Sequence, residues 1–261
     1  MTQTAGTLLQ TDLLAGKSIV ISLSLSADPG AKVGEVKGVL SLRWGAIAIS
    51  GMGRTCTSSQ DSFSRAGQVK YQFPQSEPSV TIILPVGSIW SSGLHWHERH
   101  TEFLAIQQGE AEVTLNGQTS VYGERDGVIR IERFVKHEWK RANQGNSETG
   151  KQQSLVVKEW TEPADGQKEV FFRNLNSVLL EEPTSKFPGF FTSLQLFVIF
   201  HYLDNYPVFL ECVASRWITH FILGAARILG ALVGLRPVYD EYTPRRLLST
   251  YQTHTTPDKT V

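Results

Sequence analysis

Three histidines and two glutamates lie within eight residues of this sequence, in the stretch HWHERHTE from His95 to Glu102. His95 and His97 are two positions apart, so on a β-strand both imidazoles lie on the same face and Trp96 lies on the other. A turn after His97 would bring Glu102, at the start of the next apolar run, beside the two imidazoles. Imidazoles and a carboxylate that converge in this way are typical ligands of a transition metal.

A further ligand is expected from a distant part of the chain, because a β-barrel brings remote strands together. His137 follows the alternating run GVIRIE and opens KHEWKRAN. We therefore predict a metal site formed by His95, His97, Glu102 and His137. This set suits one divalent ion, Fe, Mn, Cu, Ni or Zn, and leaves coordination positions open for substrate, water or dioxygen. The ligand types do not select among these metals.

Other polar and aromatic residues near the motif receive weaker assignments. Glu98 and His100 fall in the predicted turn and are expected to be solvated. The alternative for His100 is that it contacts a metal ligand as a base or itself replaces one of the ligands. Trp96 and Trp139 are expected to pack rather than to bind substrate. Glu132 and Glu138 flank the ligand strand and are expected to be exposed. No residue is identifiable as a catalytic acid or base.

Short β-rich runs separated by turns fill the sequence from Tyr71 to Phe172. Asn116-Gly117 predicts a hairpin, because both central residues must accept a positive φ, and Gln108-Gly109 predicts a second turn. Six to eight short strands with no helix between them are typical of a jelly roll or small barrel. The expected strands are 79–85, 102–109, 110–117, 118–123, 126–132, 136–143, 154–160 and 168–174.

These residues resemble the cupin superfamily. The first cupin motif is His-x-His, then Glu after three or four positions, then Gly after six more. Here it reads His95-Trp96-His97, four positions, Glu102, FLAIQQ and Gly109. The second motif resembles DGVIRIERFVKHEWKRAN, with His137 in the metal-binding place. Departures there put Glu132 at the usual Pro, Phe134 at the usual Gly and Arg141 at the usual Asn. The resemblance implies a cupin jelly-roll barrel over about residues 71–172.

The wider pattern resembles the cupin-domain oxidoreductases of fungal secondary-metabolite clusters, some of which work with polyketide synthases. It consists of the HWHERHTEF motif, DGVIRIERFVKHEW, KEVFFRNLN and an apolar C-terminal part. The resemblance implies a metal-dependent oxidoreductase acting on an aromatic or pre-aromatic polyketide intermediate. Two alternatives remain open. One is an isomerase, cyclase or decarboxylase that uses the metal as a Lewis acid, and the other is a module that only binds a small ligand.

Two apolar stretches after Glu182 are expected to be helices, 187–217 and 218–235, with Pro207 ending or kinking the first. The second is long enough to span a bilayer, but Arg227 at its middle opposes insertion. Its apolar stripe predicts an amphipathic helix that covers the barrel or a homodimer partner. Contact with a membrane surface is the less favoured interpretation. The stripe comprises Ile218, Phe221, Ile222, Ala225, Ile228, Leu229 and Leu232.

The expected organisation is an N-terminal segment (1–70), a barrel (71–175), a helical segment (176–240) and a polar, frayed tail (241–261). Residues 28–67 are rich in Gly and Ser without periodicity, which is typical of a linker, an irregular insertion or an error in the gene model. Lys and Arg together number 25, as do Asp and Glu, which argues against a nucleic-acid partner. Cys56 and Cys212 predict free thiols, and without a signal peptide the expected location is intracellular, in the cytoplasm.

Overall fold

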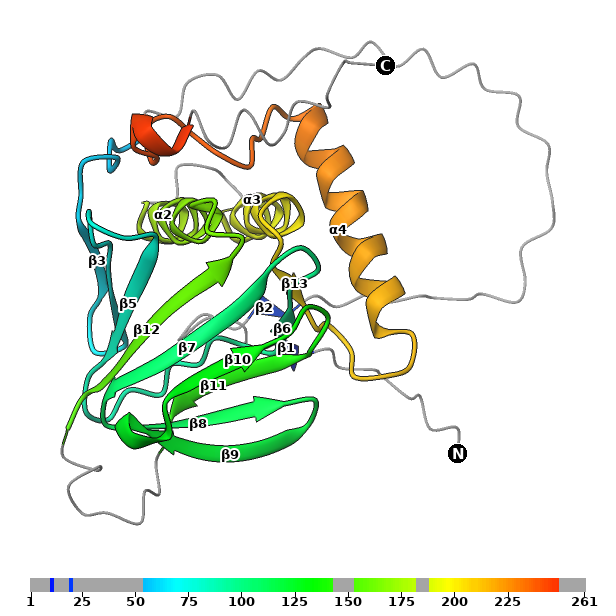
Figure 1. The fold of residues 1–261 in the computed structure, drawn as a ribbon. Helices are drawn as coiled ribbons and strands as arrows, with labels where there is room; N and C mark the ends of the chain where they lie inside the picture. Colours follow the sequence, from blue (N-terminus) through cyan, green and yellow to red (C-terminus); the bar gives the residue numbers. More distant parts are fainter. Residues whose placement is uncertain (1–9, 12–18, 21–53, 143–152, 182–187, 249–261) are drawn as a thin grey trace, which may run out of the picture.

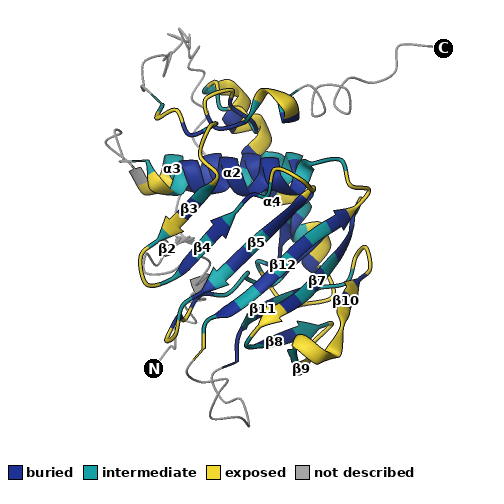
Figure 2. Cartoon of the chain, turned by 60° about the vertical axis from the view of Figure 1, so that its left-hand side comes forward, coloured by how far each residue is buried: buried dark blue, intermediate teal, exposed yellow. Residues whose placement is uncertain are grey.

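Alternating apolar and polar residues build two antiparallel sheets, which wrap around a common interior (Figure 1). The computed structural model describes residues 10–11, 19–20, 54–142, 153–181 and 188–248. Buried and less buried residues alternate along the central strands, so each strand turns one row of side chains inward (Figure 2). The result is a mainly β jelly-roll barrel with a helical C-terminal part, as expected.

One sheet has six strands in the order β10-β7-β12-β5-β4-β3, and the other has five in the order β13-β6-β11-β8-β9. The six-stranded sheet comprises β3 (Ser62–Arg65), β4 (Val69–Gln72), β5 (Ser79–Leu84), β7 (Thr101–Gln108), β10 (Val128–Ile131) and β12 (Leu155–Glu162). The five-stranded sheet comprises β6 (His95–Trp96), β8 (Glu110–Leu115), β9 (Gln118–Gly123), β11 (His137–Arg141) and β13 (Tyr206–Pro207). A separate pair is formed by β1 (Gln10–Thr11) and β2 (Ile19–Val20), and a short 3-10 helix, η1, spans Glu124–Asp126.

The turns that set the strand register carry the residues that the sequence indicated. β8 and β9 are joined by Asn116 and Gly117, whose φ angles are 47° and 84°, as a two-residue hairpin requires. Gly109 has φ 79°, and a Cβ there would lie 2.9 Å from the carbonyl oxygen of Ser154. Both predicted turns are therefore confirmed, and each permits only a residue without a bulky side chain or with tolerance for positive φ.

The turn before the ligand strand β11 keeps a glycine-like backbone without a glycine. Phe134 has φ 67°, a conformation that a bulky side chain adopts only at a cost. Its N–H donates to the carbonyl of His97 at 2.7 Å, and the Arg216 side chain donates to its carbonyl at 3.1 Å. These contacts hold the backbone at Phe134 in the conformation that the usual glycine would favour.

Helices α2 (Gln167–Leu180) and α3 (Pro188–Tyr202) lie side by side across one end of the barrel (Figures 1 and 2). The expected strand 168–174 is wrong, since these residues form the first half of α2. The expected helix 187–217 is also too long. It ends at Tyr202, and Pro207 instead pairs with His95 as part of the two-residue strand β13. A helix that caps the barrel replaces the strand expected there.

Helix α4 (Ser215–Leu232) packs against α3 through its small residues. Its buried positions are Ser215, Thr219, Leu223, Ala226 and Gly230. A Cβ on Gly230 would lie 2.5 Å from the Val198 side chain, so the two helices are in close contact there. This agrees with the four-residue spacing of small residues at Ala226 and Gly230.

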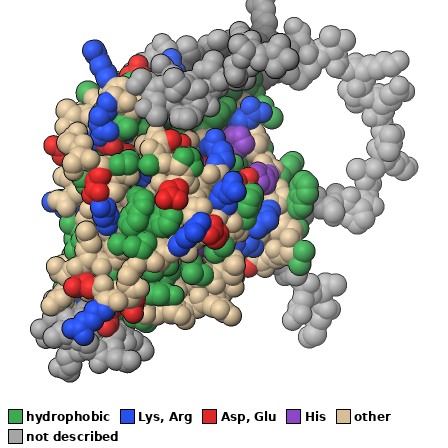
Figure 3. Space-filling view, viewed as in Figure 1, with side chains coloured by type: hydrophobic (Ala, Val, Ile, Leu, Met, Phe, Trp, Pro, Cys, Tyr) green, Lys and Arg blue, Asp and Glu red, His purple; other side chains and the backbone are tan. Residues whose placement is uncertain are grey.

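Much of the apolar stripe of α4 faces outward, so it does not cover the barrel, and the other expected role, cover of a homodimer partner, is left open. Trp217 is 80% exposed and Phe221 is 78% exposed. Figure 3 shows hydrophobic side chains at the surface on the right-hand edge, where α4 lies, beside basic side chains and histidine. The other exposed apolar residues of α4 are Ile228, Leu229 and Leu232. A homodimer or a membrane surface as the partner of this face stays a prediction.

The flanking segments are partly packed on the barrel. β3 extends the six-stranded sheet before residue 71, so the end of the 28–67 stretch is built into the fold, whereas residues 28–53 lie outside the described residues. Tyr242 and Thr243 are buried, so the expectation of a frayed tail is wrong for them. Cys56 and Cys212 are free and exposed. Among the described residues, no helix combines the length and apolar character needed to cross a bilayer.

Candidate metal centre

The four predicted ligands come from both sheets and meet inside the barrel. His95 lies on β6 and His137 on β11, directly opposite each other in the strand pairing. His97 follows β6 by one residue, and Glu102 lies on β7 of the other sheet. All four are buried, and each offers one ligand atom within 4.8 Å of the others. Among the described residues, this is the one group of at least three such side chains close enough to share an ion.

Backbone carbonyls fix the orientation of each imidazole. Nδ1 of His95 lies 2.7 Å from the carbonyl oxygen of Gly93, and Nδ1 of His137 lies 3.0 Å from that of Val135. Nδ1 of His97 likewise donates to the carbonyl of Asp204. A carbonyl only accepts hydrogen bonds, so Nδ1 carries the proton in all three rings. Nε2 of each neutral ring is then a lone pair available to a metal, as at known histidine–metal sites.

Two atoms at the centre of this group, Oε1 of Glu102 and Nε2 of His137, are buried and find no hydrogen-bond partner in the described part of the chain. They lie 3.5 Å apart. Nε2 of His97 lies 2.6 Å from Oε2 of the same glutamate, which sets a lone pair against a carboxylate. Buried acceptors without a donor are costly, and a cation relieves that cost. The residues therefore fit a bound divalent ion.

The electrostatic environment prepares the side chains for this role. Burial lowers the pKa of His95 well below its usual value, and burial with Lys168 nearby lowers the pKa of His97. Both rings are thus neutral near pH 7. Burial alone would raise the pKa of Glu102, but the Lys168 ammonium opposes it, and that pKa lies well below its usual range. The centre offers neutral imidazoles and an ionised carboxylate, the forms that bind metals.

A buried ion pair that the sequence did not reveal borders the centre. Lys168, on α2, places Nζ 2.5 Å from Oε2 of Glu102 and 2.5 Å from Oε1 of Glu159, on β12. Burial would lower the pKa of Lys168, but the two carboxylates raise it above its usual value. Burial and the charge of Glu102 raise the pKa of Glu159 to about 7. The sequence hid this pair because residues 168–174 resemble a strand.

His100 is buried, so its expected solvation is wrong. Its Nδ1 lies 2.6 Å from Oδ2 of Asp204 and its Nε2 lies 3.1 Å from Oδ2 of Asp165. Burial would lower the pKa of His100, but these carboxylates raise it. Asp204 also accepts the backbone N–H groups of residues 98–100, and its carbonyl binds His97. His100 thus touches the centre only through Asp204, and its role as a contact of a ligand stays a prediction.

The other assigned residues divide between confirmed and corrected predictions. Trp96 is fully buried and stacks on Tyr206 at 5.6 Å between ring centroids, which confirms packing. Trp139 is buried as well, and Glu132 is exposed as expected. Glu98 is only partly exposed, because it binds the Trp96 indole N–H at 3.0 Å and Nε2 of His220 at 2.9 Å. Glu138 is half-buried rather than exposed.

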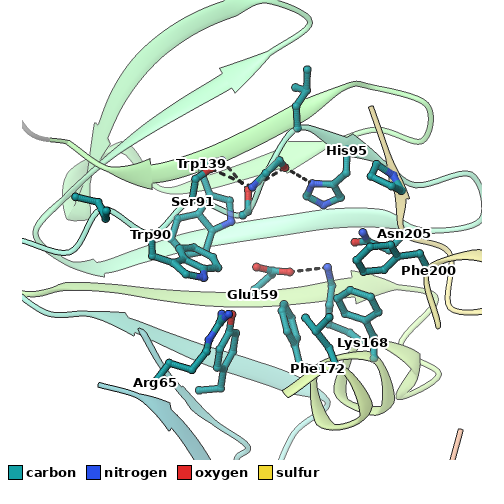
Figure 4. Close-up of a pocket in the computed structure, with 18 residues that line it drawn as sticks. Arg65, Trp90, Ser91, His95, Trp139, Glu159, Lys168, Phe172, Phe200 and Asn205 are labelled. Atoms are coloured by element: carbon teal, nitrogen blue, oxygen red, sulfur yellow. Dashed lines mark hydrogen bonds and ion pairs between the residues drawn. The ribbon is translucent and has the colours of Figure 1, made fainter. Parts of the chain in front are cut away.

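A cavity of about 120 Å³ adjoins the centre, and His95 belongs to its wall (Figure 4). Figure 4 shows the Glu159–Lys168 pair between His95 and Arg65, with Trp90 and Trp139 on one side and Phe172 on the other. Phe171 and Phe200 complete the aromatic lining. A small molecule in this cavity would lie between aromatic rings and beside the group of metal ligands.

No protein-family model matches this chain, and no curated protein matches it. Solved structures align with about two fifths of it. KdgF from Halomonas sp. is 19% identical, with 38% of this chain and 83% of that chain covered and a TM-score of 0.29. The cupin domain of Cnp3 from Schizosaccharomyces pombe is 19% identical over 42% and 75%, with a TM-score of 0.29. A predicted oxalate decarboxylase from Thermotoga maritima is 21% identical over 40% and 95%, with a TM-score of 0.29.

Proposed function

We propose that this protein is a metal-dependent oxidoreductase of the cupin type that acts on a small aromatic or pre-aromatic organic molecule. One observation carries the proposal. Three imidazoles and a carboxylate converge beside an aromatic cavity whose wall includes His95, and two of their ligand atoms have no hydrogen-bond partner among the described residues. A redox-active divalent ion held there would supply open coordination positions and one-electron chemistry. The proposal includes a polyketide intermediate as the substrate.

The chain's own residues would bind and orient the substrate and exclude water. Trp90 and Trp139 lie with ring centroids 5.0 Å apart and form one wall, and Phe171 and Phe172 lie 5.2 Å apart on α2. Helices α2 and α3 cover this end of the barrel (Figure 1). Lys168 holds Glu102 in its ionised form and so maintains the negative ligand. Burial of Glu102 and Lys168 strengthens the charge interaction between them.

A second candidate is a Lewis-acid enzyme, an isomerase, cyclase or decarboxylase, and one residue favours it. Glu159 lines the cavity and has a pKa raised to about 7 by burial and by the charge of Glu102. A carboxyl group with a pKa near the working pH is suited to move a proton. Under this alternative Glu159 would exchange a proton with the bound molecule while Lys168 holds its other oxygen, as Figure 4 shows.

Elemental analysis of the purified full chain, wild type beside His97→Ala, tests the proposal. We expect about one iron, manganese or copper ion per chain in the wild type and none in the variant. Dioxygen consumption with added single-ring aromatic compounds would then support oxidation. Zinc or nickel, with activity kept without dioxygen, would favour the Lewis-acid alternative. No metal in either protein would refute both and leave a small-ligand binding module.

A further inference from the structure

The cavity wall contains hydrogen-bond donors from which no described residue accepts. Nε of Arg65 and Nε1 of Trp139 are both buried, and neither has a hydrogen-bond partner among the described residues. Both residues line the cavity. Nη2 of Arg65 donates to the Tyr71 hydroxyl at 2.9 Å, which fixes the guanidinium while leaving Nε available. Buried donors of this kind cost free energy unless a ligand or water accepts from them.

The size and walls of the cavity limit what can accept from these donors. An apolar cavity of about 150 Å³ holds one benzene molecule, so a cavity of about 120 Å³ has room for no more than about one ring within its walls. Its aromatic walls offer ring faces at Trp90, Phe172 and Phe200. Aromatic side chains stack on one another or meet edge to face, and a ligand ring gains the same contacts. The occupant is therefore one ring that also carries an acceptor.

The charges around the cavity indicate the sign of that acceptor. Arg65, Lys168 and Glu159 line the cavity, and Lys168 also pairs with Glu102 beside it, so two cations face two carboxyl groups before a metal binds. A divalent cation on the ligand group leaves the site with an excess of positive charge. Figure 4 places Arg65 and His95 on opposite sides of the cavity, with Glu159 and Lys168 between them. An anionic group at the Arg65 side would balance the excess.

We propose that the cavity binds a single-ring aromatic carboxylate, with the carboxylate on Arg65 and the opposite edge of the ring toward His95 and the metal centre. The inference rests on the proposed function and names its substrate class. A guanidinium holds a carboxylate through charged, directional hydrogen bonds, and Arg65 keeps one buried donor for this purpose. The indole N–H of Trp139 adds a second donor to the wall. Arg65 is thus a specificity residue.

Binding of benzoate and of benzamide, its neutral isostere, to the metal-loaded full chain tests this inference. Trp90 and Trp139 line the cavity, so their fluorescence reports occupancy. We expect benzoate to bind at least about tenfold more tightly than benzamide. Arg65→Met should abolish this preference without changing metal content. Arg130→Met is the matched control, because Arg130 is a surface residue paired with Glu132, and it should keep the preference.

Further variants keep the test decisive. Arg65→Lys retains the charge but loses the planar fork, so the preference should fall severalfold even where Arg65→Met folds poorly by circular dichroism. Trp139→Phe keeps the ring and removes the N–H, and benzoate should bind it severalfold more weakly than it binds the wild type. Equal affinity for the two probes in the wild type, no benzoate binding at all, or an unchanged preference in both Arg65 variants would overturn the inference.

The outcomes also separate this inference from the proposed function. A preference that survives in the Arg65 variants but disappears in His97→Ala would place the carboxylate on the metal, which refutes the role of Arg65 while the metal site stands. An Arg65-dependent preference in a chain that binds no metal would refute the proposed function and retain the carboxylate site. Metal binding without any preference between the probes would refute only the carboxylate site.

Discussion

The candidate metal centre buries charged side chains, whereas helix α4 exposes apolar ones. The metal centre and its ion pair bury three histidines, two glutamates and a lysine, whereas α4 exposes most of its large apolar residues, with Trp217 80% and Phe221 78% exposed. Burying charged groups costs free energy unless they are paired or bind an ion. Exposing large apolar groups in a row is unusual for a surface that contacts only water. Each region therefore points to something that binds there.

The two regions differ in how far the described chain completes them. At Glu102, Lys168 donates to Oε2, whereas Oε1 has no hydrogen-bond partner among the described residues, so the site lacks only a cation. The face of α4 that packs in the fold includes the small residues Ala226 and Gly230, and Gly230 lies against Val198 of α3. Small residues bring helix axes close, which turns the bulky stripe outward. Close packing of one face thus decides which face is left for a partner.

The largest expected effect is loss of the metal from the barrel site. His97→Ala and His95→Ala should each lower the bound metal from about one ion per chain to near zero, because each removes one of four ligands. Elemental analysis after desalting measures this directly. His220→Ala is the control, since His220 lies on α4 and binds Glu98 rather than the centre. A full complement of metal in either ligand variant would contradict the assignment of the buried histidines as metal ligands, and with it the contrast between the two regions.

Removing the buried lysine should destabilise the metal-free protein strongly. Lys168→Met leaves Glu102 and Glu159 buried without their shared cation, which costs about 3–5 kcal/mol in the free energy of unfolding. Denaturant titration with and without metal measures it, and bound metal should offset part of the loss. Lys158→Met removes a more exposed pair with Glu77 and should cost less than about 1 kcal/mol. Equal costs for both variants would contradict a special role for the buried lysine.

The His100 contacts should contribute more to stability in mildly acidic solution than in basic solution. The folded-state pKa of His100 is raised above its usual value, so its charge-linked contribution is complete below about pH 6.5 and lost as the pH rises through the folded-state pKa. His100→Gln should therefore cost about 3–5 kcal/mol at pH 5.5 and about 1–3 kcal/mol at pH 9. Denaturant titrations of both proteins at the two pH values measure the difference, and a cost that grows with pH would contradict this assignment.

The smallest effects are expected on the outer face of α4. Trp217→Ser and Phe221→Ser should change the free energy of unfolding by no more than about 0.5 kcal/mol, because both side chains are mostly exposed. Leu223→Ala, on the buried face of the same helix, should cost about 2–5 kcal/mol.

Sedimentation of the same proteins tests the homodimer. If α4 joins two copies, the wild type sediments as a dimer and Trp217→Ser dissociates it at the same concentration. A substantial loss of monomer stability in Trp217→Ser or Phe221→Ser would show that this face is covered within the chain.

Much of the barrel could be predicted because alternation and turn residues act locally. The strand expected at 118–123 matches β9 residue for residue, and the Asn116-Gly117 hairpin has the predicted backbone. Helix α2 was missed because the apolar run 170–172 suits a strand as well as a helix. The signal that favours a helix was present in Glu169 and Arg173, four positions apart, which form an ion pair at 2.8 Å.

The sequence by itself determined the ligand set and the barrel that holds it. His95, His97 and Glu102 lie within eight residues, so a strand, a turn and the next strand suffice to bring them together. Only the tertiary structure decided the rest. Glu102 and Lys168 are 66 positions apart, and His97 and Asp204 are 107 apart. Local sequence patterns do not encode which helices cover the barrel or which face of α4 packs. Those choices depend on the summed packing of surfaces that are distant in the sequence.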